Sequence, residues 1–153
     1  MDLHNISNLL SQIPFFSGLT PEALRLIAFS GDRTTFSRGD TIFAARQKSE
    51  GGHLVLEGQV ELFLARRFNS PVRTISVGGL IGEVALLAPT ERPIWAIAAT
   101  DCLTLKITRG AVLRVLNEFP EGAAALRQML VGRVKSLLAE LASQQLKNQS
   151  SVS

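Results

Sequence analysis

One short segment of the chain combines residue types that can bind an anion and a sugar: Gly82, Glu83 and Arg92. An apolar stretch begins directly after Gly82, which predicts a helix N-terminus, where free backbone N–H groups and a partial positive charge attract anions. Arg92 can add a permanently charged, bidentate donor to the same anion. The Glu83 carboxylate can accept hydrogen bonds from sugar hydroxyls. The segment therefore predicts a site for a ligand with one phosphate and one ribose.

The order of residues 82–92 (Gly-Glu-Val-Ala-Leu, a short loop, then Arg) resembles the phosphate-binding cassette of the cyclic nucleotide-binding domain family. The run Glu91–Trp95 is similar to the same region of catabolite activator proteins. Three more stretches resemble the family's N-terminal helical segment and barrel hairpins, in the family's order: residues 14–19, 38–43 and 56–62. The resemblance covers almost the whole chain. It implies an effector domain like those of catabolite activator proteins and protein kinase A regulatory subunits, with cyclic AMP or cyclic GMP as ligand and no required cofactor.

The resemblance also implies the ligand contacts. Glu83 would hold the ribose, Arg92 the phosphate, and the backbone N–H of Ala85 would point into the phosphate site. Pro93 departs from the family, which usually has Ala or Ser there, because proline has no N–H to offer the phosphate. The implied set is Gly82, Glu83, Val84, Ala85, Arg92 and Pro93.

The long C-terminal helix of the family carries polar residues that meet the nucleotide base. By spacing from Pro120, the matching lid positions in this chain are Leu137 and Leu138. Leucine side chains offer no hydrogen bonds that could separate adenine from guanine. Together with Pro93, they predict weak and poorly selective cyclic nucleotide binding, or adaptation to another anionic ligand.

The periodicity of the chain predicts an α+β, mainly β fold. Helical spacing occurs over residues 3–12 and 20–29, and short apolar runs broken by glycine then favour an antiparallel β-roll, or jelly roll, over about 31–108. Strands are expected around 54–56, 60–64, 72–77, 94–97 and 102–107. Helical spacing returns at Arg109, is interrupted at Pro120 and continues over 121–147. We expect one domain over 1–147, with C-terminal helices at about 109–147 and a disordered tail at 148–153.

The composition limits the class of protein. With 153 residues, 46% hydrophobic and 19% charged, the chain is typical of one globular domain. It has no apolar run of the roughly 18 residues that a membrane helix needs, no signal-like basic N-terminus, and a single cysteine, Cys102, which favours the cytoplasm. The net charge of +3 is scattered rather than gathered in a stripe, so direct nucleic-acid binding is not expected.

Catalysis is the least favoured function. No Ser-His-Asp or Cys-His pattern and no Gly-rich nucleotide loop is present. His4 and His53, the two histidines, lie in distant segments, which argues against a metal centre. Cys102 is expected to be a buried, inert thiol. We therefore predict no catalytic residue and no metal site.

The C-terminal helix is apolar over a wide face, which predicts a homodimer through residues 123–146. The face comprises Leu126, Leu130, Val134, Leu137, Leu138 and Leu141. Because the chain ends about six residues after this helix, we expect no DNA-reading domain, and a transcriptional role would need a separate protein partner. The predicted function is a stand-alone module that senses a cyclic nucleotide and signals through its C-terminal helix. The alternative is a ligand-free protein-interaction module, or a sensor of another anion, on the same fold.

Overall fold

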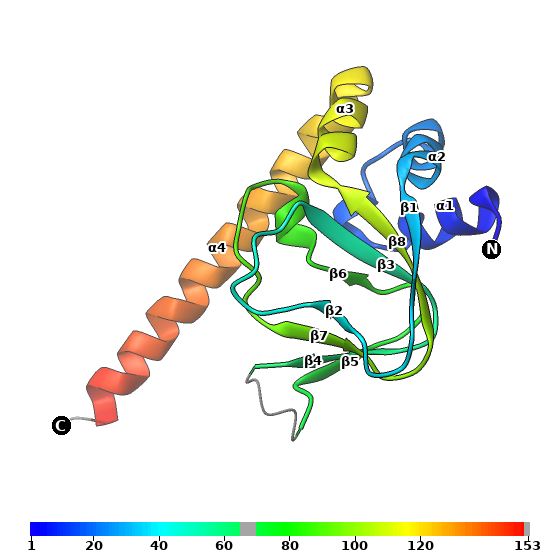
Figure 1. Cartoon of the computed structure of the whole chain (residues 1–153). Helices are drawn as coiled ribbons and strands as arrows, with labels where there is room; N and C mark the ends of the chain where they lie inside the picture. The colour runs from blue at the N-terminus through cyan, green and yellow to red at the C-terminus, as the bar shows by residue number, and fades with distance from the viewer. Residues whose placement is uncertain (65–69, 152–153) are drawn as a thin grey trace.

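The chain folds into a roll of two antiparallel β-sheets, with helices before and after it in the sequence (Figure 1). The computed structural model describes residues 1–64 and 70–151. Within them each sheet has four strands, in the spatial orders β1-β8-β3-β6 and β2-β7-β4-β5. The strands are β1 (Asp32–Phe36), β2 (Thr41–Phe43), β3 (Gly51–Glu57), β4 (Val60–Phe63), β5 (Arg73–Ile75), β6 (Leu80–Ile81), β7 (Trp95–Ala98) and β8 (Cys102–Thr108). The paired strands are antiparallel, which confirms the predicted roll.

The helices begin close to the predicted positions. They are α1 (Leu3–Ser11), η1 (Pro14–Phe16), α2 (Pro21–Ser30), η2 (Glu83–Leu86), α3 (Arg109–Glu118) and α4 (Pro120–Ser151). Helices α1, α2 and α3 each start after a residue whose side-chain oxygen accepts a hydrogen bond from the first turn: Asp2, Thr20 and Thr108. Such a cap satisfies a backbone N–H that has no acceptor inside the helix.

Helix α4 is longer than the sequence suggests. It continues to Ser151, so residues 148–151 belong to the helix. No Gly or Pro follows Lys147, so the backbone has no residue there that would end the helix. Residues 152–153 lie outside the described part of the chain.

The β1-β8-β3-β6 sheet lies between two hydrophobic cores, one shared with the helices and one inside the roll. The outer face of the β1-β8-β3-β6 sheet packs against α1, α2 and α3, and its inner face closes the interior of the roll. Six of the seven residues of β3 are buried, because this strand has an apolar layer on each side. Leu54, Leu56, Leu105 and Ile107 face the helices, and Val55 with Val60, Ile75 and Ala96 fills the roll.

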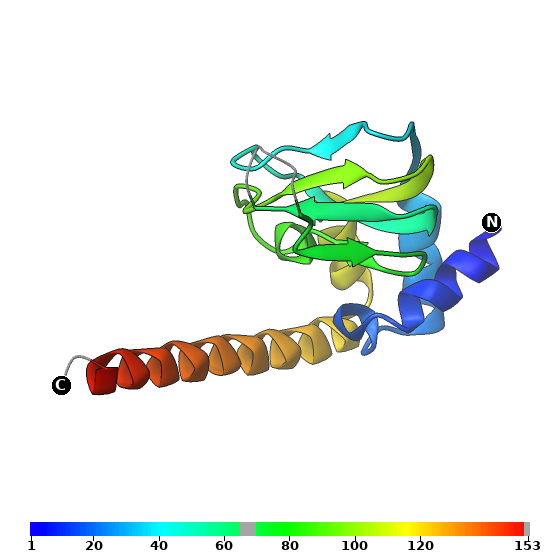
Figure 2. The same cartoon turned by 90° about the horizontal axis from the view of Figure 1, so that it is seen from below.

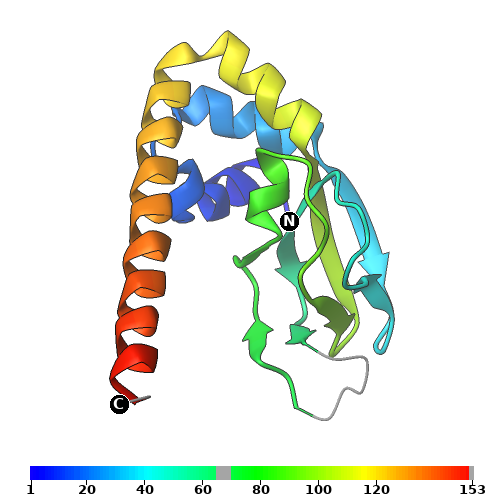
Figure 3. The same cartoon turned by 90° about the vertical axis from the view of Figure 1, so that its left-hand side faces the viewer.

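The beginning of α4 packs closely on the N-terminal segment. A Cβ added to Gly18 would lie 2.2 Å from Cβ of Ala125, and one added to Gly122 would lie 2.2 Å from Cδ2 of Leu19. Beyond this root, α4 projects past the roll in Figures 1 and 2, and in Figure 3 it runs down beside the roll, apart from its strands. Leu138 and Leu141 are accordingly 60% and 57% exposed.

We expect Gly51→Ala to destabilise the fold by at least about 3 kcal/mol. The added Cβ would lie 1.9 Å from the backbone oxygen of Ile107, and two paired central strands cannot separate locally. Gly110→Ala is the matched control, because nothing lies within 4 Å of its added Cβ. Urea unfolding followed by circular dichroism measures both variants. Equal midpoints for the two would show that β3 and β8 are not packed as described.

Candidate functional site

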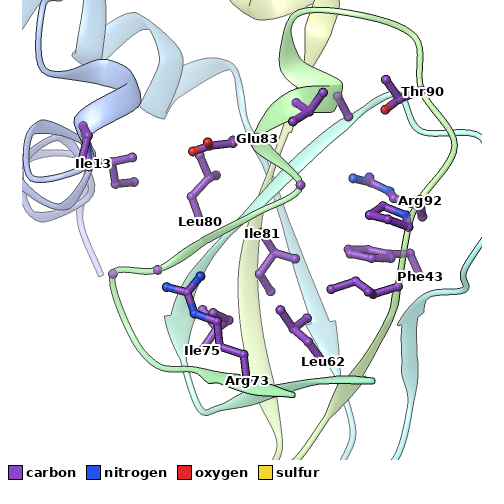
Figure 4. Close-up of a pocket in the computed structure, with 18 of the residues that line it drawn as sticks. Ile13, Phe43, Leu62, Arg73, Ile75, Leu80, Ile81, Glu83, Thr90 and Arg92 are labelled. Atoms are coloured by element: carbon purple, nitrogen blue, oxygen red, sulfur yellow. The ribbon is translucent and has the colours of Figure 1, made fainter. Parts of the chain in front are cut away.

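The main cavity of the described residues has a volume of about 560 Å³ and opens beside the turn after β6. All six residues that the sequence analysis implicated in ligand contact line it: Gly82, Glu83, Val84, Ala85, Arg92 and Pro93. Apolar walls come from the roll and from Ile13 and Pro14 of the N-terminal segment (Figure 4). The structure therefore brings the two halves of the segment 82–93 to one concave surface.

The guanidinium of Arg92 is the most constrained polar group in this cavity. The side chain is only 7% exposed and stacks on the ring of Phe43, with Cζ 4.2 Å from the ring centroid (Figure 4). Nη2 donates to the backbone oxygen of Gly51, whereas Nη1 is buried and has no hydrogen-bond partner among the described residues. Burial lowers the pKa of Arg92, yet arginine stays charged at physiological pH. A buried cation with an unsatisfied nitrogen favours an anion at Nη1.

The backbone around Arg92 is fixed by a ladder to the segment after β2. The N–H of Arg92 donates to the oxygen of Gln47 at 2.8 Å, and the oxygen of Arg92 accepts from Arg46 at 2.7 Å. Thr90, two residues before Arg92, is held in the same way: its oxygen accepts from the N–H and the hydroxyl of Ser49, at 3.0 and 2.7 Å. The side chain of Arg92 thus starts from a backbone held on both sides.

Gly82 gives Arg92 the space it occupies. Its φ is +79°, a left-handed conformation that L-residues rarely adopt. A Cβ at Gly82 would also lie 2.1 Å from Nη1 of Arg92. Both the backbone conformation and the close approach therefore require glycine, and they place the unsatisfied Nη1 next to the start of η2.

The predicted helix N-terminus is a single 3-10 turn, η2. Its first N–H groups have no acceptor inside the turn, as in any helix start. The N–H of Ala85, which the family resemblance directs at the phosphate, donates here to the oxygen of Gly82 at 3.2 Å. The N–H of Ala85 can donate to an anion only if its hydrogen bond to the Gly82 oxygen becomes bifurcated or breaks. Pro93 lines the cavity and brings no N–H to it.

The lid residues are not placed at the cavity. None of the α4 side chains that the structure describes lines it, and Leu138 is 60% exposed to solvent. The side chain of Leu137 lies outside the described part of the structure. The lid role of both leucines stays a prediction that would require α4 to move toward the roll.

Three residues that hold Arg92 or line its cavity were not predicted from the sequence. Phe43 supplies the stacking surface for Arg92, Gly51 its backbone acceptor, and Arg73 a second arginine in the cavity. Arg73 comes from β5 and lies across the cavity from Arg92 (Figure 4). A positive charge between the apolar residues Val72 and Ile75 was the only sequence signal for Arg73. Its spacing gave no indication that it lies near residues 82–92.

His53 is buried beside the same arginine. It is 6% exposed, and its Nδ1 lies 3.0 Å from Oγ1 of Thr104, which is also buried. Burial, reinforced by the positive charges of Arg92 and Lys106, lowers the pKa of His53 from 6.5 to about 4. The ring is therefore neutral at physiological pH.

The part of the chain that the structure describes has neither a metal-binding cluster nor a membrane-spanning helix. The described residues contain no group of three or more His, Cys, Asp or Glu side chains placed to hold a metal ion. None of their helices is long and apolar enough to cross a membrane. The predicted cytoplasmic location stays a prediction.

The fold and the site define a β-roll domain with a preformed cationic cavity. Residues 33–119 match the sequence profile described as "Cyclic nucleotide-binding domain". This match covers more than half of the chain, which therefore belongs to the cyclic nucleotide-binding domain family. The family resemblance of the segment 82–92 is thereby confirmed.

Similar proteins carry related descriptions. The chain is 30% identical over 131 residues to the cyclic AMP receptor protein of Thermus thermophilus, a match of 84% of this chain and 60% of that protein. It is 30% identical over 101 residues to the cAMP-dependent protein kinase regulatory subunit of Eremothecium gossypii, covering 66% of this chain and 21% of that protein. The N-terminal domain of a Streptomyces coelicolor transcriptional regulator superposes with a TM-score of 0.75 at 27% identity, covering 84% and 94% of the two chains. The chain thus spans less than two thirds of these two sequence relatives.

We expect the folded state to lose about 2 kcal/mol of stability between pH 7 and pH 5 through His53. Its pKa is lower in the folded chain than in the unfolded chain, so the unfolded chain binds more protons as the pH falls from 6.5 toward 4. The stabilisation is therefore full above pH 6.5 and is lost on acidification. Urea unfolding of wild type and His53→Gln at several pH values measures the difference in slope.

His4 is the control for this titration, because it is the other histidine and is exposed on α1. His4→Gln removes the other histidine and is measured in parallel. A wild-type curve that runs parallel to the His53→Gln curve would contradict the burial of a neutral His53.

Proposed function

We propose that this chain is a regulatory module that binds a cyclic nucleotide at Arg92 and transmits binding to its C-terminal helices. The observation that carries the proposal is the buried, unpartnered Nη1 of Arg92 beside Gly82. An equatorial phosphate oxygen at Nη1 would remove the cost of leaving this donor unsatisfied. Glu83, the residue after Gly82, lines the same cavity, and its carboxylate would accept hydrogen bonds from a ribose attached to that phosphate.

Arg109 offers a route for the signal. It is the first residue of α3, and its Nη1 donates to the oxygen of Ala85 at 3.1 Å and to the oxygen of Ser49 at 3.3 Å. A ligand that draws η2 toward its phosphate would change the position of the Ala85 carbonyl and so pull on α3. Helix α3 is followed directly by α4, so the movement reaches the long helix. Such a switch needs a ligand that binds the two arrangements with different affinity.

Helix α4 is the surface through which the module would dimerise. Three apolar residues on its projecting part are exposed: Val131 by 49%, Leu138 by 60% and Leu141 by 57%. Their separations of seven and three residues follow the heptad spacing of a helix pair. A second copy of α4 would cover them, and the movement of α3 would then alter the geometry of the dimer.

The alternative is a module that senses a different anion. Pro93 removes one phosphate donor that the family usually has, and Arg73 adds a second cation across the cavity from Arg92. These two features suit a ligand with acceptors at both ends. Cyclic AMP and cyclic GMP are therefore the first ligands to test, and their failure would favour this alternative.

We expect wild type to bind cyclic AMP or cyclic GMP, and Arg92→Ala to weaken that binding at least about 100-fold, because the charge and both donors of the guanidinium are lost. Titration calorimetry measures the affinities, and a ligand at 100 times its Kd should also raise the stability by about 2.7 kcal/mol. Pro93→Ala restores a backbone N–H and should tighten binding about tenfold. Absence of binding to wild type at millimolar nucleotide would refute the cyclic nucleotide proposal.

We expect the double variant Leu138→Glu/Leu141→Glu to be monomeric and to keep the ligand affinity of one isolated site. Two carboxylates in the apolar seam would each lose hydration on dimerisation. Light scattering coupled to size-exclusion chromatography measures the mass. Glu140→Gln, a neighbouring change off these two positions, should stay dimeric, and a monomeric wild type at high concentration would refute the dimer.

A further inference from the structure

A second cavity, of about 330 Å³, lies on the other side of the Arg92 and Phe43 pair. Both residues line both cavities and so form the wall between them. The remaining walls come from the strands β2, β3 and β8 and the segment after β2. The lining residues are Ile42, Phe43, Gln47, Lys48, Glu50, His53, Arg92 and Lys106.

The charge of this second cavity is mostly positive. Lys48, Lys106 and Arg92 line it, against the single carboxylate of Glu50. No ion pair within the described residues neutralises either lysine, because neither has a carboxylate oxygen within 4.0 Å there. The lysines are thus available to a charged ligand, and the surplus of positive charge favours an anion.

His53 provides a buried, neutral hydrogen-bonding group in the same place. It is the direct cross-strand partner of Lys106, and both side chains lie on the inner face of the sheet. Nδ1 is engaged with the hydroxyl of Thr104 at 3.0 Å, whereas Nε2 has no hydrogen-bond partner among the described residues. When the Thr104 hydroxyl donates to Nδ1, the neutral ring carries its proton on Nε2 and can donate it to a ligand.

We propose that this second cavity binds a phosphate group, held by Lys106, Lys48 and the Nε2–H of His53. Lysine ammonium groups act as point charges and suit a phosphate, which presents acceptor oxygens in several directions. The cavity is large enough for inorganic phosphate or for a small phosphomonoester. Glu50 sets a limit on the affinity, because its carboxylate repels the anion from the rim.

A phosphate in the second cavity would act on the first cavity through Arg92. This consequence rests on the proposed cyclic nucleotide site, whereas binding in the second cavity does not. Two anions on opposite sides of one guanidinium repel each other and share one positive charge. Phosphate should therefore weaken cyclic nucleotide binding about three- to tenfold, and the nucleotide should weaken phosphate binding by the same factor.

The histidine ring signals in an NMR titration with inorganic phosphate test the site without any nucleotide. The chain has two histidines, so the exposed His4 serves as an internal reference at constant pH and ionic strength. We expect the His53 signals to shift saturably while those of His4 do not. Movement of His53 no greater than that of His4 would overturn the proposal.

Charge variants assign the shift to the second cavity, because Lys106 and Glu50 line it and do not line the first. Lys106→Met should weaken phosphate binding at least about fivefold, and Glu50→Gln should strengthen it about two- to fivefold. Lys135→Met on α4 removes the same charge far from the cavity and should have no effect. Equal binding by wild type and Lys106→Met would overturn the proposal.

Two further arms identify the source of the phosphate and its effect. Glycerol 3-phosphate binding more tightly than inorganic phosphate would assign the cavity to phosphomonoesters, and the reverse order would assign it to the free ion. Titration of cyclic AMP with and without phosphate then measures the coupling in wild type and Lys106→Met. Failure of cyclic AMP to bind would refute the first site alone, because the shift of His53 is measured without it.

Discussion

The structure depends on one buried cation that the fold satisfies only in part. Arg92 has its charge stacked on Phe43 and one nitrogen bonded to the Gly51 oxygen, and it keeps a second nitrogen without a partner. Burying a charge is costly unless hydrogen bonds compensate it. Much of the surrounding architecture exists to hold this group: the ladder from 46–49 to 90–92, the left-handed Gly82 and the glycine at the start of β3. A buried donor without a partner gains free energy when the oxygen of an anion accepts its hydrogen bond.

The same arginine connects parts of the molecule that are far apart in the sequence. Its Nη2 bonds to Gly51 at the start of β3, and its Nη1 lies against Gly82, just before η2. Arg109, the first residue of α3, donates hydrogen bonds to the oxygens of Ser49, just before β3, and Ala85 in η2. A shift of η2 by a bound anion therefore has a covalent and hydrogen-bonded path to the long helix. Beyond its first turns, α4 stands apart from the strands of the roll (Figures 2 and 3).

Much of the fold could be predicted from the sequence, because capping residues and periodicity are local signals. Thr20 before Pro21 marks the start of α2, and the alternation around Gly58 marks the β3 and β4 hairpin. Strands β1 and β6 gave weak signals. The first is an edge strand with mostly polar residues, and the second has only two residues. The extent of α4 was underestimated because polar residues without glycine or proline are compatible with both helix and tail.

The part of the site that lies in one continuous segment, residues 82–93, could be predicted from the sequence. Gly82, Glu83 and Arg92 are close in sequence, and their spacing identified the cassette. Phe43 and Arg73 reach the cavity, and Gly51 reaches Arg92, only through strand pairing and tertiary packing, so no spacing rule pointed to them. The same holds for His53, which is an isolated histidine in the sequence but lines the second cavity together with Arg92.

The central claim is that the free nitrogen of Arg92 receives the phosphate of the ligand. A crystal structure of the chain grown with cyclic AMP tests it most directly. We expect a phosphate oxygen within hydrogen-bond distance of Nη1, with Nη2 still bonded to the oxygen of Gly51. A nucleotide phosphate bound elsewhere in the cavity, with Nη1 paired to protein or water instead, would contradict the claim.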